Sequence, residues 1–353
     1  MPSVHLIVPD LFLPADIAAE ACEDLRLPAL ERMLARGVST NSSPSTGSSP
    51  STGSGRTEGK SSLEDWLCRL FGVPIQNDAP IAPISAAFDG LGSGCWLRAD
   101  PVHLRLQRDR LILLPELEVE AGEAAQLCAA LNEHFAGQGM AFFAPHPQRW
   151  YMRLDRLPDI ETVPPSQAAG RNVRDLLPKG MEAAHWHRLF NEIQMLLHSH
   201  AANEAREARG ELPVNSVWFW GSGCAANTSP RKNYVCVSSD EALAEMFAAA
   251  AGVPFAGWPE RWRDDGGSAR QLLVWTGLRS ALRRGDLEGW RAALQEFEAG
   301  YMQPLWQALR TGKISRLQVD VPGGERVRRV TLNRVDTWAF WRRSRPLAQY
   351  SMV

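Results

Sequence analysis

Strand-like and helix-like segments alternate through the second half of the chain, and this alternation constrains the fold more than any other feature. The segments SVWFW, QLLVWTGL and SRLQVDVP have the pattern of strands, whereas ALAEMFAAAAG and LEGWRAALQEFEAGYMQPLWQAL have the pattern of helices. Helices between strands supply the crossovers that parallel pairing needs. The alternation therefore predicts an α/β fold in which a mostly parallel sheet carries helices on both faces.

The N-terminal part is predicted to add a strand and two helices to this core. Residues 4–9 form an apolar run typical of a buried strand, and ALERMLAR places Leu30, Met33 and Leu34 on one helix face. Residues 39–62 consist almost wholly of Ser, Thr, Gly and Pro, so they have little to bury and are predicted to form a flexible surface loop. The following segment, SLEDWLCRLFGVP, has the pattern of a short amphipathic helix.

The pattern changes between about residues 90 and 157. A β-β-α-β run there predicts an inserted α+β subdomain, which leaves residues 1–89 and 158–353 for the core. Residues 158–184 are rich in Pro and polar groups and are predicted to form a linker, followed by one long helix over residues 185–209. The last segment, RVRRVTLNRVDTWAFWRR, is predicted to form one or two edge strands, with Trp338 and Trp341 packed near the terminus.

Composition and charge exclude several classes of partner. The 353 residues carry a formal net charge of -2, so no overall field favours nucleic acid or an anionic membrane. The chain has neither a signal-peptide pattern nor an apolar run of the roughly 18 residues that a membrane helix needs. Its six cysteines have no metal-like spacing and are interpreted as reduced, mostly buried thiols. We therefore expect a soluble, cytoplasmic protein that binds neither nucleic acid nor membrane.

The stretch HSHAANEAREARGELPVNSVWFWGSG carries the most specific functional signal. It resembles the archaeal-type cofactor-independent phosphoglycerate mutases of the alkaline phosphatase superfamily, in which a helix ending in His-Pro-x-Asn-x-x-Arg precedes a strand ending in Gly-x-Gly. The matching residues here are His200, Asn203, Arg206, Gly210, Asn215, Gly221 and Gly223.

The resemblance covers most of residues 4–255. The first strand, ending in Asp10, is similar to the family's strand that ends in a metal-binding Asp, and LPALERMLARG is similar to the helix that follows it. Over nearly the whole chain the sequence also resembles the bacterial RpfE-type regulatory proteins. The resemblance implies an alkaline-phosphatase-like α/β core with an inserted α+β subdomain.

Family members use two metal ions, usually manganese or zinc, together with a serine that carries the phosphoryl group. Several of the metal ligands lie in the last third of the chain, but none of the eight histidines here follows His200. The segments TGLRSALRRGD and VDVPGGERV correspond to ligand-bearing segments of the family and contain no imidazole. Carboxylates and water do not replace fixed nitrogen donors well, so we expect no metal cofactor; the alternative is manganese or zinc in a rearranged site.

Asp10 and Ser62 are the weak catalytic candidates. Asp10 ends a strand where open α/β sheets bind ligands, so it is either a metal ligand or a carboxylate bonded to nearby backbone. The family's serine opens a helix ending in Phe-Gly, and counting back from Gly72 places Leu63 at that position. Ser62 would therefore need a one-residue shift to act as the nucleophile, and its alternative role is a helix N-cap ahead of Asp65.

Asn203, Arg206 and His200 are the candidate ligand-binding residues. An arginine fork beside an amide suits a phosphate or carboxylate group, but positive charge at a helix C-terminus is favourable without any ligand. The Gly221-Ser222-Gly223 turn either exposes backbone N–H groups to a ligand or lets the strand turn sharply. The partners expected are a phosphorylated or carboxylate small molecule or another protein.

Three functions follow from these residues. The leading hypothesis is a degenerate mutase-like protein without a dimetal centre that acts in regulation or binding. The alternative is an active phosphoglycerate mutase or phosphomonoesterase whose rearranged site uses Asp10, Ser62, His200 and Arg206. A scaffold without a small-molecule ligand is the third.

Overall fold

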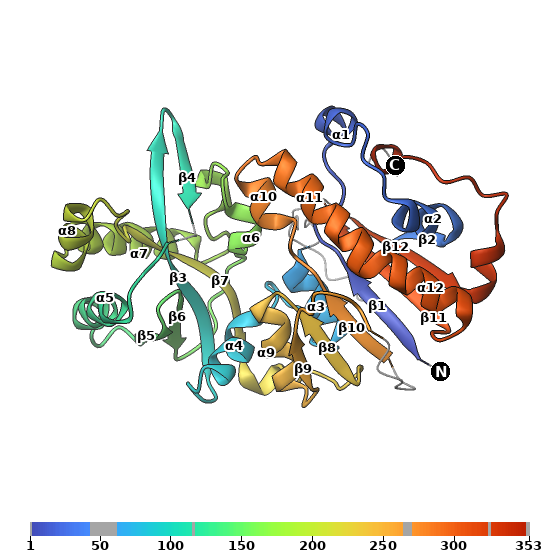
Figure 1. Ribbon diagram of the computed structural model, residues 1–353. Helices are drawn as coiled ribbons and strands as arrows, with labels where there is room; N and C mark the ends of the chain where they lie inside the picture. The colour runs from blue at the N-terminus through green and yellow to red at the C-terminus, as the bar shows by residue number, and fades with distance from the viewer. Residues whose placement is uncertain (1, 43–61, 115–116, 264–269, 324–325, 351–353) are drawn as a thin grey trace. The chain divides into compact units, whose positions relative to one another are not determined.

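The computed structural model describes residues 2–42, 62–114, 117–263, 270–323 and 326–350. The chain divides into two compact units (Figure 1). Unit 1 comprises Met1–Trp66 and Lys232–Val353, and unit 2 comprises Leu67–Arg231. The boundary falls inside helix α3 (Leu63–Leu70), whose first turn belongs to unit 1.

A seven-stranded sheet in the order β2-β12-β11-β1-β10-β8-β9 forms the centre of unit 1. Its strands are β1 (Ser3–Ile7), β2 (Val38–Ser42), β8 (Cys236–Ser239), β9 (Phe255–Gly257), β10 (Arg270–Val274), β11 (Arg316–Gly323) and β12 (Arg326–Asn333). The strands from β11 to β9 pair in parallel, whereas β12 and β2 are antiparallel additions. The predicted mostly parallel sheet of an α/β fold is therefore confirmed.

Helices of unit 1 connect these strands and pack on the sheet. They are α1 (Ala15–Ala21), α2 (Pro28–Arg36), α9 (Ala242–Ala250), α10 (Arg279–Arg283), α11 (Leu287–Phe297) and α12 (Gln303–Thr311). One turn of π-helix, Glu298–Met302, joins α11 to α12, so the predicted long helix is continuous. The 3-10 helices η4 (Arg334–Trp338) and η5 (Leu347–Tyr350) follow β12.

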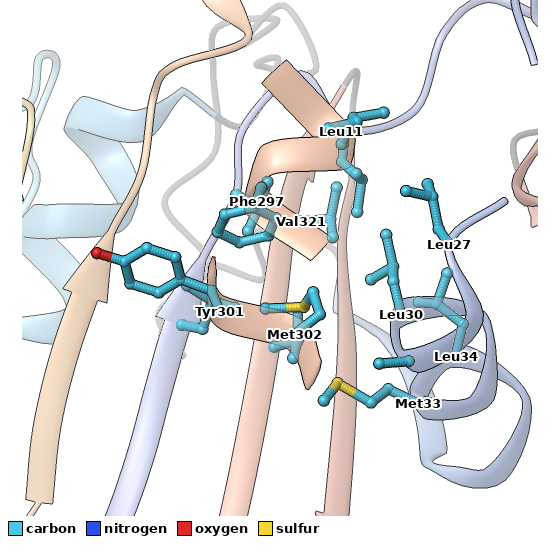
Figure 2. Close-up of a cluster of buried hydrophobic side chains, with 14 of the residues drawn as sticks. Leu11, Leu27, Leu30, Met33, Leu34, Phe297, Tyr301, Met302 and Val321 are labelled. Carbon is cyan, nitrogen blue, oxygen red and sulfur yellow. The ribbon is translucent and has the colours of Figure 1, made fainter. Parts of the chain in front are cut away.

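The two faces of the central strands differ in chemistry because side chains alternate along a strand. On one face, Leu6, Val319 and Val321 pack into the main apolar cluster with α2 and the α11–α12 segment. Figure 2 shows Leu30, Met33 and Leu34 of α2 within this cluster, as the predicted helix face requires. The other face carries polar residues, among them His5, Gln318 and Asp320.

Unit 2 contains a mixed helix and strand fold around a five-stranded sheet in which β4, β3, β6 and β5 are neighbours and β7 pairs with β3. Its strands are β3 (Cys95–Gln107), β4 (Arg110–Leu114), β5 (Met140–His146), β6 (Arg149–Leu154) and β7 (Ser216–Cys224). Its helices are α4 (Ile81–Phe88), α5 (Ala121–His134), α6 (Pro165–Ala168), α7 (Ala183–His198) and α8 (Ala201–Ala208), with 3-10 turns at Arg174–Leu176 and Ala225–Asn227.

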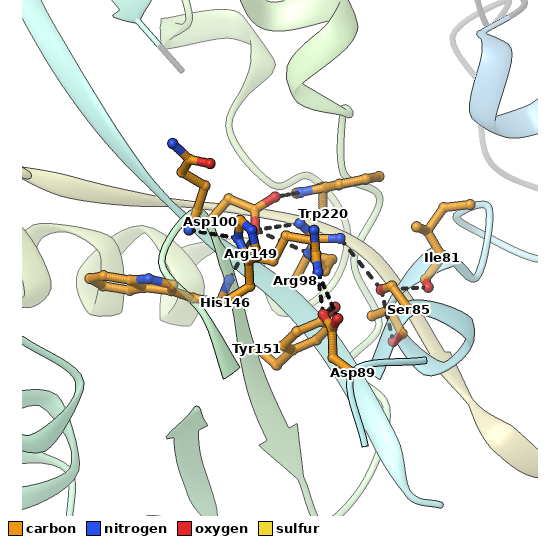
Figure 3. Close-up of polar contacts among 12 residues, drawn as sticks. Ile81, Ser85, Asp89, Arg98, Asp100, His146, Arg149, Tyr151 and Trp220 are labelled. Carbon is orange, nitrogen blue, oxygen red and sulfur yellow. Dashed lines mark hydrogen bonds and ion pairs between the residues drawn. The ribbon is translucent and has the colours of Figure 1, made fainter. Parts of the chain in front are cut away.

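A buried ion pair holds the strands of unit 2 together. Arg98 of β3 binds Asp100 and lies over the rings of Tyr151 and Trp220, with its guanidinium carbon 5.0 and 5.1 Å from the ring centres (Figure 3). Asp100 also accepts hydrogen bonds from the backbone N–H of Trp150 and from Trp220 Nε1. Because the carboxylate has these partners on three strands, the pair fixes the β6-β3-β7 arrangement.

The expected division at residues 90 and 157 differs from the division that the structure shows. The SVWFW segment, in β7, pairs antiparallel with β3 instead of joining the parallel sheet. Helix α4 packs beside both strands, and the segment from 158 to 209 belongs to the same unit. Strand pairing therefore extends the second unit well beyond the predicted insert.

Three local predictions were also wrong. The long helix predicted over residues 185–209 is interrupted at Ser199 and His200, where His200 caps α8. Residues 39–42 of the Ser-rich tract form most of β2, because backbone hydrogen bonding to β12 needs no apolar side chains; the prediction for 43–61 lies outside the described residues. With β2 added, β12 is not an edge strand.

The aromatic residues near the C-terminus and two of the cysteines also differ from expectation. Trp338 and Trp341 are 64% and 69% exposed rather than packed. Cys95 and Cys224 form a disulfide between paired positions of β3 and β7, with 4.0 Å between their Cα atoms. Two thiols 129 positions apart become neighbours only through this strand register. Within the described ranges, no helix is both long and apolar enough to cross a membrane.

Candidate functional site

The carboxyl ends of the parallel strands in unit 1 gather charged residues at one edge of the sheet. Asp10 follows β1, Asp240 and Glu241 follow β8, and Arg279 begins α10 just after β10. Neighbouring strands β1, β10 and β8 run parallel, so their ends meet at this edge. Such an edge is the usual ligand site of an open α/β sheet.

Arg279 occupies the centre of this carboxylate cluster. Its Nε lies 3.4 Å from Asp10 Oδ2, and its Nη1 lies 3.3 Å from Glu241 Oε2. Burial opposes the charge of Arg279, but the carboxylates of Glu64, Asp10 and Glu241 outweigh it and raise the pKa of the guanidinium. Arg279 is thus the positive charge around which the acidic groups are arranged.

The two carboxylates after β8, of which Asp240 is exposed and Glu241 half-buried, have separate roles. Burial raises the pKa of both Asp240 and Glu241, although hydrogen bonds and the charge of Arg279 act in the opposite direction. Asp240 accepts the backbone N–H of Thr276 at 2.8 Å, which ties the end of β10 to the end of β8. Glu241 caps α9 by accepting the N–H of Leu243. These bonds hold the cluster in place.

Asp10 adopts an unusual backbone conformation. Its φ of 61° lies in the left-handed region, which is uncommon for residues other than glycine. Its side chain is 41% exposed and bonds to Arg279. Outliers of this kind concentrate at functional sites, so Asp10 has the backbone geometry of a ligand-site residue even though its side chain binds an arginine.

Ser62 and Glu64 lie at the start of α3, in the part of this helix that belongs to unit 1. Ser62 is 6% exposed, and its Oγ accepts the backbone N–H of Asp65 at 3.0 Å, so it caps the helix. Glu64 is also 6% exposed, and its Oε2 has no hydrogen-bond partner among the described residues. Its charge instead acts on Arg279 and Glu241. A buried carboxylate oxygen without a hydrogen-bond partner lowers the stability of the folded state.

A second buried network lies on the polar face of the sheet, along β1 and β11. Asp320 accepts hydrogen bonds from His5 Nε2 at 2.8 Å and from Trp66 Nε1 at 3.1 Å, and Arg329 of β12 binds it through two nitrogens at 2.9 and 3.0 Å. Burial lowers the pKa of His5 despite Asp320, so the imidazole is neutral and its Nδ1 accepts from the Tyr234 hydroxyl. The bond to Trp66 anchors α3, which carries Glu64 and is capped by Ser62.

The predicted ligand-binding residues lie in unit 2, on α8 and at its start. Asn203 is 1% exposed; its amide donates to the carbonyls of Leu197 and Val214 and accepts the Val214 N–H. His200 Nδ1 accepts the N–H of Ala202. Both side chains therefore make local bonds that hold the ends of α8.

Arg206 is almost fully buried and is neutralised within the chain. Its Nη1 lies 2.5 Å from Glu123 of α5, and its Nε donates to the carbonyl of Leu212. Arg209 binds the other oxygen of Glu123. Burial would raise the pKa of Glu123, but hydrogen bonds from the Glu120 backbone, Arg209 and Arg206 lower it. The arginine fork is thus directed at a protein carboxylate.

Gly221, Ser222 and Gly223 lie in β7 and pack closely against the segment before α4. Gly221 has a φ of 70°, and a Cβ on Gly223 would lie 2.5 Å from a side-chain atom of Pro80. The N–H of Gly221 donates to Thr162, whereas the hydroxyl of Ser222 donates to Asp78. The glycines therefore meet a steric requirement of close packing. The sharp turn predicted for them is not present, because β7 continues to Cys224.

The donor set at the carboxyl edge does not fit a dimetal centre. Among the residues that the structure describes, no group of three or more His, Cys, Asp or Glu side chains is arranged to hold a metal ion. A divalent ion needs ligand oxygens at about 2 Å. The carboxylates of Asp10 and Glu241 are directed at a guanidinium, and a cation placed there would meet the charge of Arg279.

Comparisons with known proteins agree with the fold and give a limited indication of function. No protein-family model matches this chain. The 2,3-bisphosphoglycerate-independent phosphoglycerate mutase of Methanosarcina barkeri is 26% identical over 156 residues, which cover 42% of this chain and 38% of that protein. A probable enzyme of the same name from Geobacter sulfurreducens is 38% identical over 66 residues, 19% of this chain and 16% of that protein. The matched segments thus span well under half of these relatives.

Two solved structures are similar over nearly the whole chain. A Pyrococcus horikoshii protein aligns with a TM-score of 0.50 and 12% identity, covering 99% of this chain and 92% of its own. The cofactor-independent phosphoglycerate mutase of Thermoplasma acidophilum aligns with a TM-score of 0.46 and 16% identity, covering 94% and 90%. Over part of its length the chain is similar in sequence to phosphoglycerate mutases, and the similar solved structures agree with the predicted α/β fold with a mostly parallel sheet.

Sequence reasoning found Asp10 but missed Glu64, Glu241 and Arg279. The available signal was positional: Asp240 and Glu241 directly follow a strand, and Arg279 begins a helix five residues after another strand ends. Charged residues at the carboxyl ends of predicted parallel strands are candidates for one common site. The order of the strands, which the sequence alone does not give, decides which of these residues meet.

We expect Asn203→Ala to lower the free energy of unfolding by about 2–4 kcal/mol, because it leaves the buried backbone groups of Leu197 and Val214 without partners. Asn191→Ala, at an exposed position of α7, is the matched control and should change it by less than about 0.5 kcal/mol. Urea denaturation measures both. An unchanged stability of the Asn203 variant would show that its side chain is available to a ligand.

Proposed function

We propose that this protein is a non-catalytic relative of the metal-dependent phosphoglycerate mutases and acts as a regulatory or interaction protein. The observation that carries the proposal is Arg279, which lies among Asp10, Glu241 and Glu64 at the edge of the sheet that binds ligands in this type of fold. The guanidinium supplies, from the chain itself, the positive charge that metal ions supply in the mutases. The finer assignment to RpfE-type regulators is part of this proposal and rests on the sequence resemblance.

The charge balance at the carboxyl edge favours a protein partner over an anionic metabolite. Three carboxylates surround one guanidinium, so the cluster around Arg279 has an excess of negative charge that repels phosphate. In unit 2 the charge of Arg206 is already compensated by Glu123. We infer that Asn203, Arg206 and His200 stabilise α8, and that regulation proceeds through contacts with another macromolecule.

The alternative is metal-dependent phosphoryl transfer through Asp10 and Ser62. The strained backbone of Asp10 favours this alternative. The position of Ser62 disfavours phosphoryl transfer, because its hydroxyl oxygen caps α3 and its side chain is buried. A serine nucleophile needs a base or metal that ionises the hydroxyl, and no metal-binding group within the described ranges offers that activation.

Turnover assays distinguish the two functions. The purified full chain is incubated with 3-phosphoglycerate or a generic aryl phosphate and with Mn²⁺, Zn²⁺ or no metal, alongside Ser62→Ala. We expect no metal-stimulated turnover and no difference between the two proteins. Metal-stimulated turnover that disappears in Ser62→Ala would overturn the proposal. Thermal unfolding with 3-phosphoglycerate gives a second readout, and we expect no shift of the midpoint.

A further inference from the structure

The C-terminal part of unit 1 exposes large apolar side chains next to arginines. In the segment from 334 to 345, which follows β12, Val335, Trp338, Phe340 and Trp341 are 81%, 64%, 78% and 69% exposed. Single exposed apolar residues are common on protein surfaces, but four within seven positions, with the rings of Phe340 and Trp341 in contact, concentrate apolar surface in the way that interaction sites do. We call residues 334–345 the aromatic–arginine segment.

The backbone of this segment is fixed, so the exposure is not fraying of a chain end. Buried and exposed residues alternate: Thr337 is 6% exposed and Ala339 is 5% exposed, on either side of Trp338. Arg36 of α2 donates from Nη1 to the carbonyl of Thr337, and Arg342 donates to the carbonyl of Arg36. The fold therefore holds the backbone against α2 while the aromatic rings face solvent.

The surroundings of the exposed rings are strongly basic, in contrast to the net charge of the chain. The segment contains four arginines and one acidic residue, Asp336, whose carboxylate accepts the N–H of Asn333. Arg334 also donates to the carbonyl of Arg310, which brings exposed Arg310 and nearby Lys313 to the same region. A surface of this charge is complementary to an anionic partner.

Aromatic rings surrounded by arginines match the interface of an anionic bilayer. Tryptophan and phenylalanine insert at the level of the headgroups, and each basic residue near an anionic leaflet adds attraction. The modes by which proteins commonly recognise one another through a peptide segment need an amphipathic helix or an open strand edge. Here η4 is only five residues long, and β12 is paired on both sides by β11 and β2.

We propose that the aromatic–arginine segment docks unit 1 on an anionic membrane surface. The rings of Trp338, Phe340 and Trp341 enter the headgroup region, and Arg343 and Arg345 contact lipid phosphates. This is peripheral attachment and involves no membrane-spanning helix. It goes beyond the proposed regulatory function and replaces the expectation, based on net charge, that the protein has no membrane partner.

Co-sedimentation of the full chain with vesicles tests this proposal. Vesicles contain equal parts phosphatidylglycerol and phosphatidylcholine, or phosphatidylcholine alone. We expect binding to the anionic vesicles only, with weaker binding at ~0.5 M NaCl because salt screens the arginines. The variant Trp338→Ala/Phe340→Ala/Trp341→Ala should bind at least about tenfold more weakly, and Arg343→Glu/Arg345→Glu at least about thirtyfold more weakly.

The matched control removes three exposed apolar residues of unit 2. Leu106, Met181 and Met195 are 66%, 87% and 75% exposed, and their combined change to Ala should leave vesicle binding unchanged. Circular dichroism confirms that each variant is folded. The proposal is overturned if the full chain does not bind anionic vesicles at low salt, or if the control loses as much binding as the aromatic variant. It is also overturned if the wild-type chain does not bind vesicles but self-associates or binds duplex DNA, and the aromatic variant loses that self-association or DNA binding.

Discussion

Replacing Arg279 with Met should destabilise the protein and make its stability depend on Mn²⁺. The side chain is similar in length but uncharged, so Asp10, Glu64 and Glu241 lose their common counter-charge. Leaving buried charges unpaired costs about 3–5 kcal/mol, and somewhat less here because Asp10 is partly exposed. A set of carboxylate oxygens suits a hard cation such as Mn²⁺, and once the guanidinium is gone we expect these side chains to turn towards the freed position and bind the ion there.

Thermal unfolding with and without millimolar Mn²⁺ measures this effect. The wild type should show no shift, whereas the Arg279 variant should be stabilised by about 3 kcal/mol if Mn²⁺ is present at about a hundred times its dissociation constant. Arg284→Met, at the exposed end of α10, is the matched control and should behave like the wild type. If the Arg279 variant is as stable as the wild type and does not respond to Mn²⁺, Arg279 is not the charge that organises the cluster.

Replacing Asp320 with Asn should be the most destabilising change in the sheet. The side chain is fully buried and accepts from His5, Trp66 and Arg329, so its loss leaves the Arg329 charge without its carboxylate. We expect a loss of about 3–5 kcal/mol of unfolding free energy at neutral pH. Asp16→Asn, exposed on α1, is the control and should cost less than about 1 kcal/mol. A loss for Asp320→Asn no larger than that of the control would contradict this account.

The same network predicts how stability depends on pH. Burial alone would raise the pKa of Asp320, but hydrogen bonds from His5 and Arg329, together with the charge of Arg329, lower it to about 2. A carboxyl whose pKa is lower in the folded state binds more protons when unfolded, so its stabilisation is present above pH ~4 and is lost as the pH falls towards 2. The lost contribution is on the order of 2 kcal/mol. Urea denaturation should show that the free energy of unfolding of the wild type is lower at pH 3 than at pH 7 because of this loss. The Asp320→Asn variant should lack this contribution.

The sequence predicts local structure well where periodicity and burial agree. The alternation after residue 230 and the apolar face of α2 follow from side-chain spacing, and both appear in unit 1. The SVWFW strand shows the limit of such patterns. Its apolar residues suit either sheet, and the choice depends on partners distant in sequence, such as the bonds from Trp218 to Val163 and from Trp220 to Asp100.

The candidate site shows the same limit. Asp10 could be placed from the end of its strand, and the cap role of Ser62 from its position before Asp65. The role of Arg279 could not be predicted, because it depends on the order of the strands, which brings the ends of β1, β10 and β8 to one edge of the sheet. Asn203 and Arg206 attracted a ligand hypothesis because their residue types suit anions, but their partners Val214, Leu212 and Glu123 become apparent only in three dimensions.

The metal content of the wild-type chain tests the central claim most directly. The full chain is saturated with Mn²⁺ and Zn²⁺, desalted and analysed by inductively coupled plasma mass spectrometry. An arginine at the centre of the carboxylate cluster predicts that neither metal is retained in stoichiometric amount. Two tightly bound ions per chain would show that a dimetal centre forms around Asp10 despite Arg279, and would contradict the account.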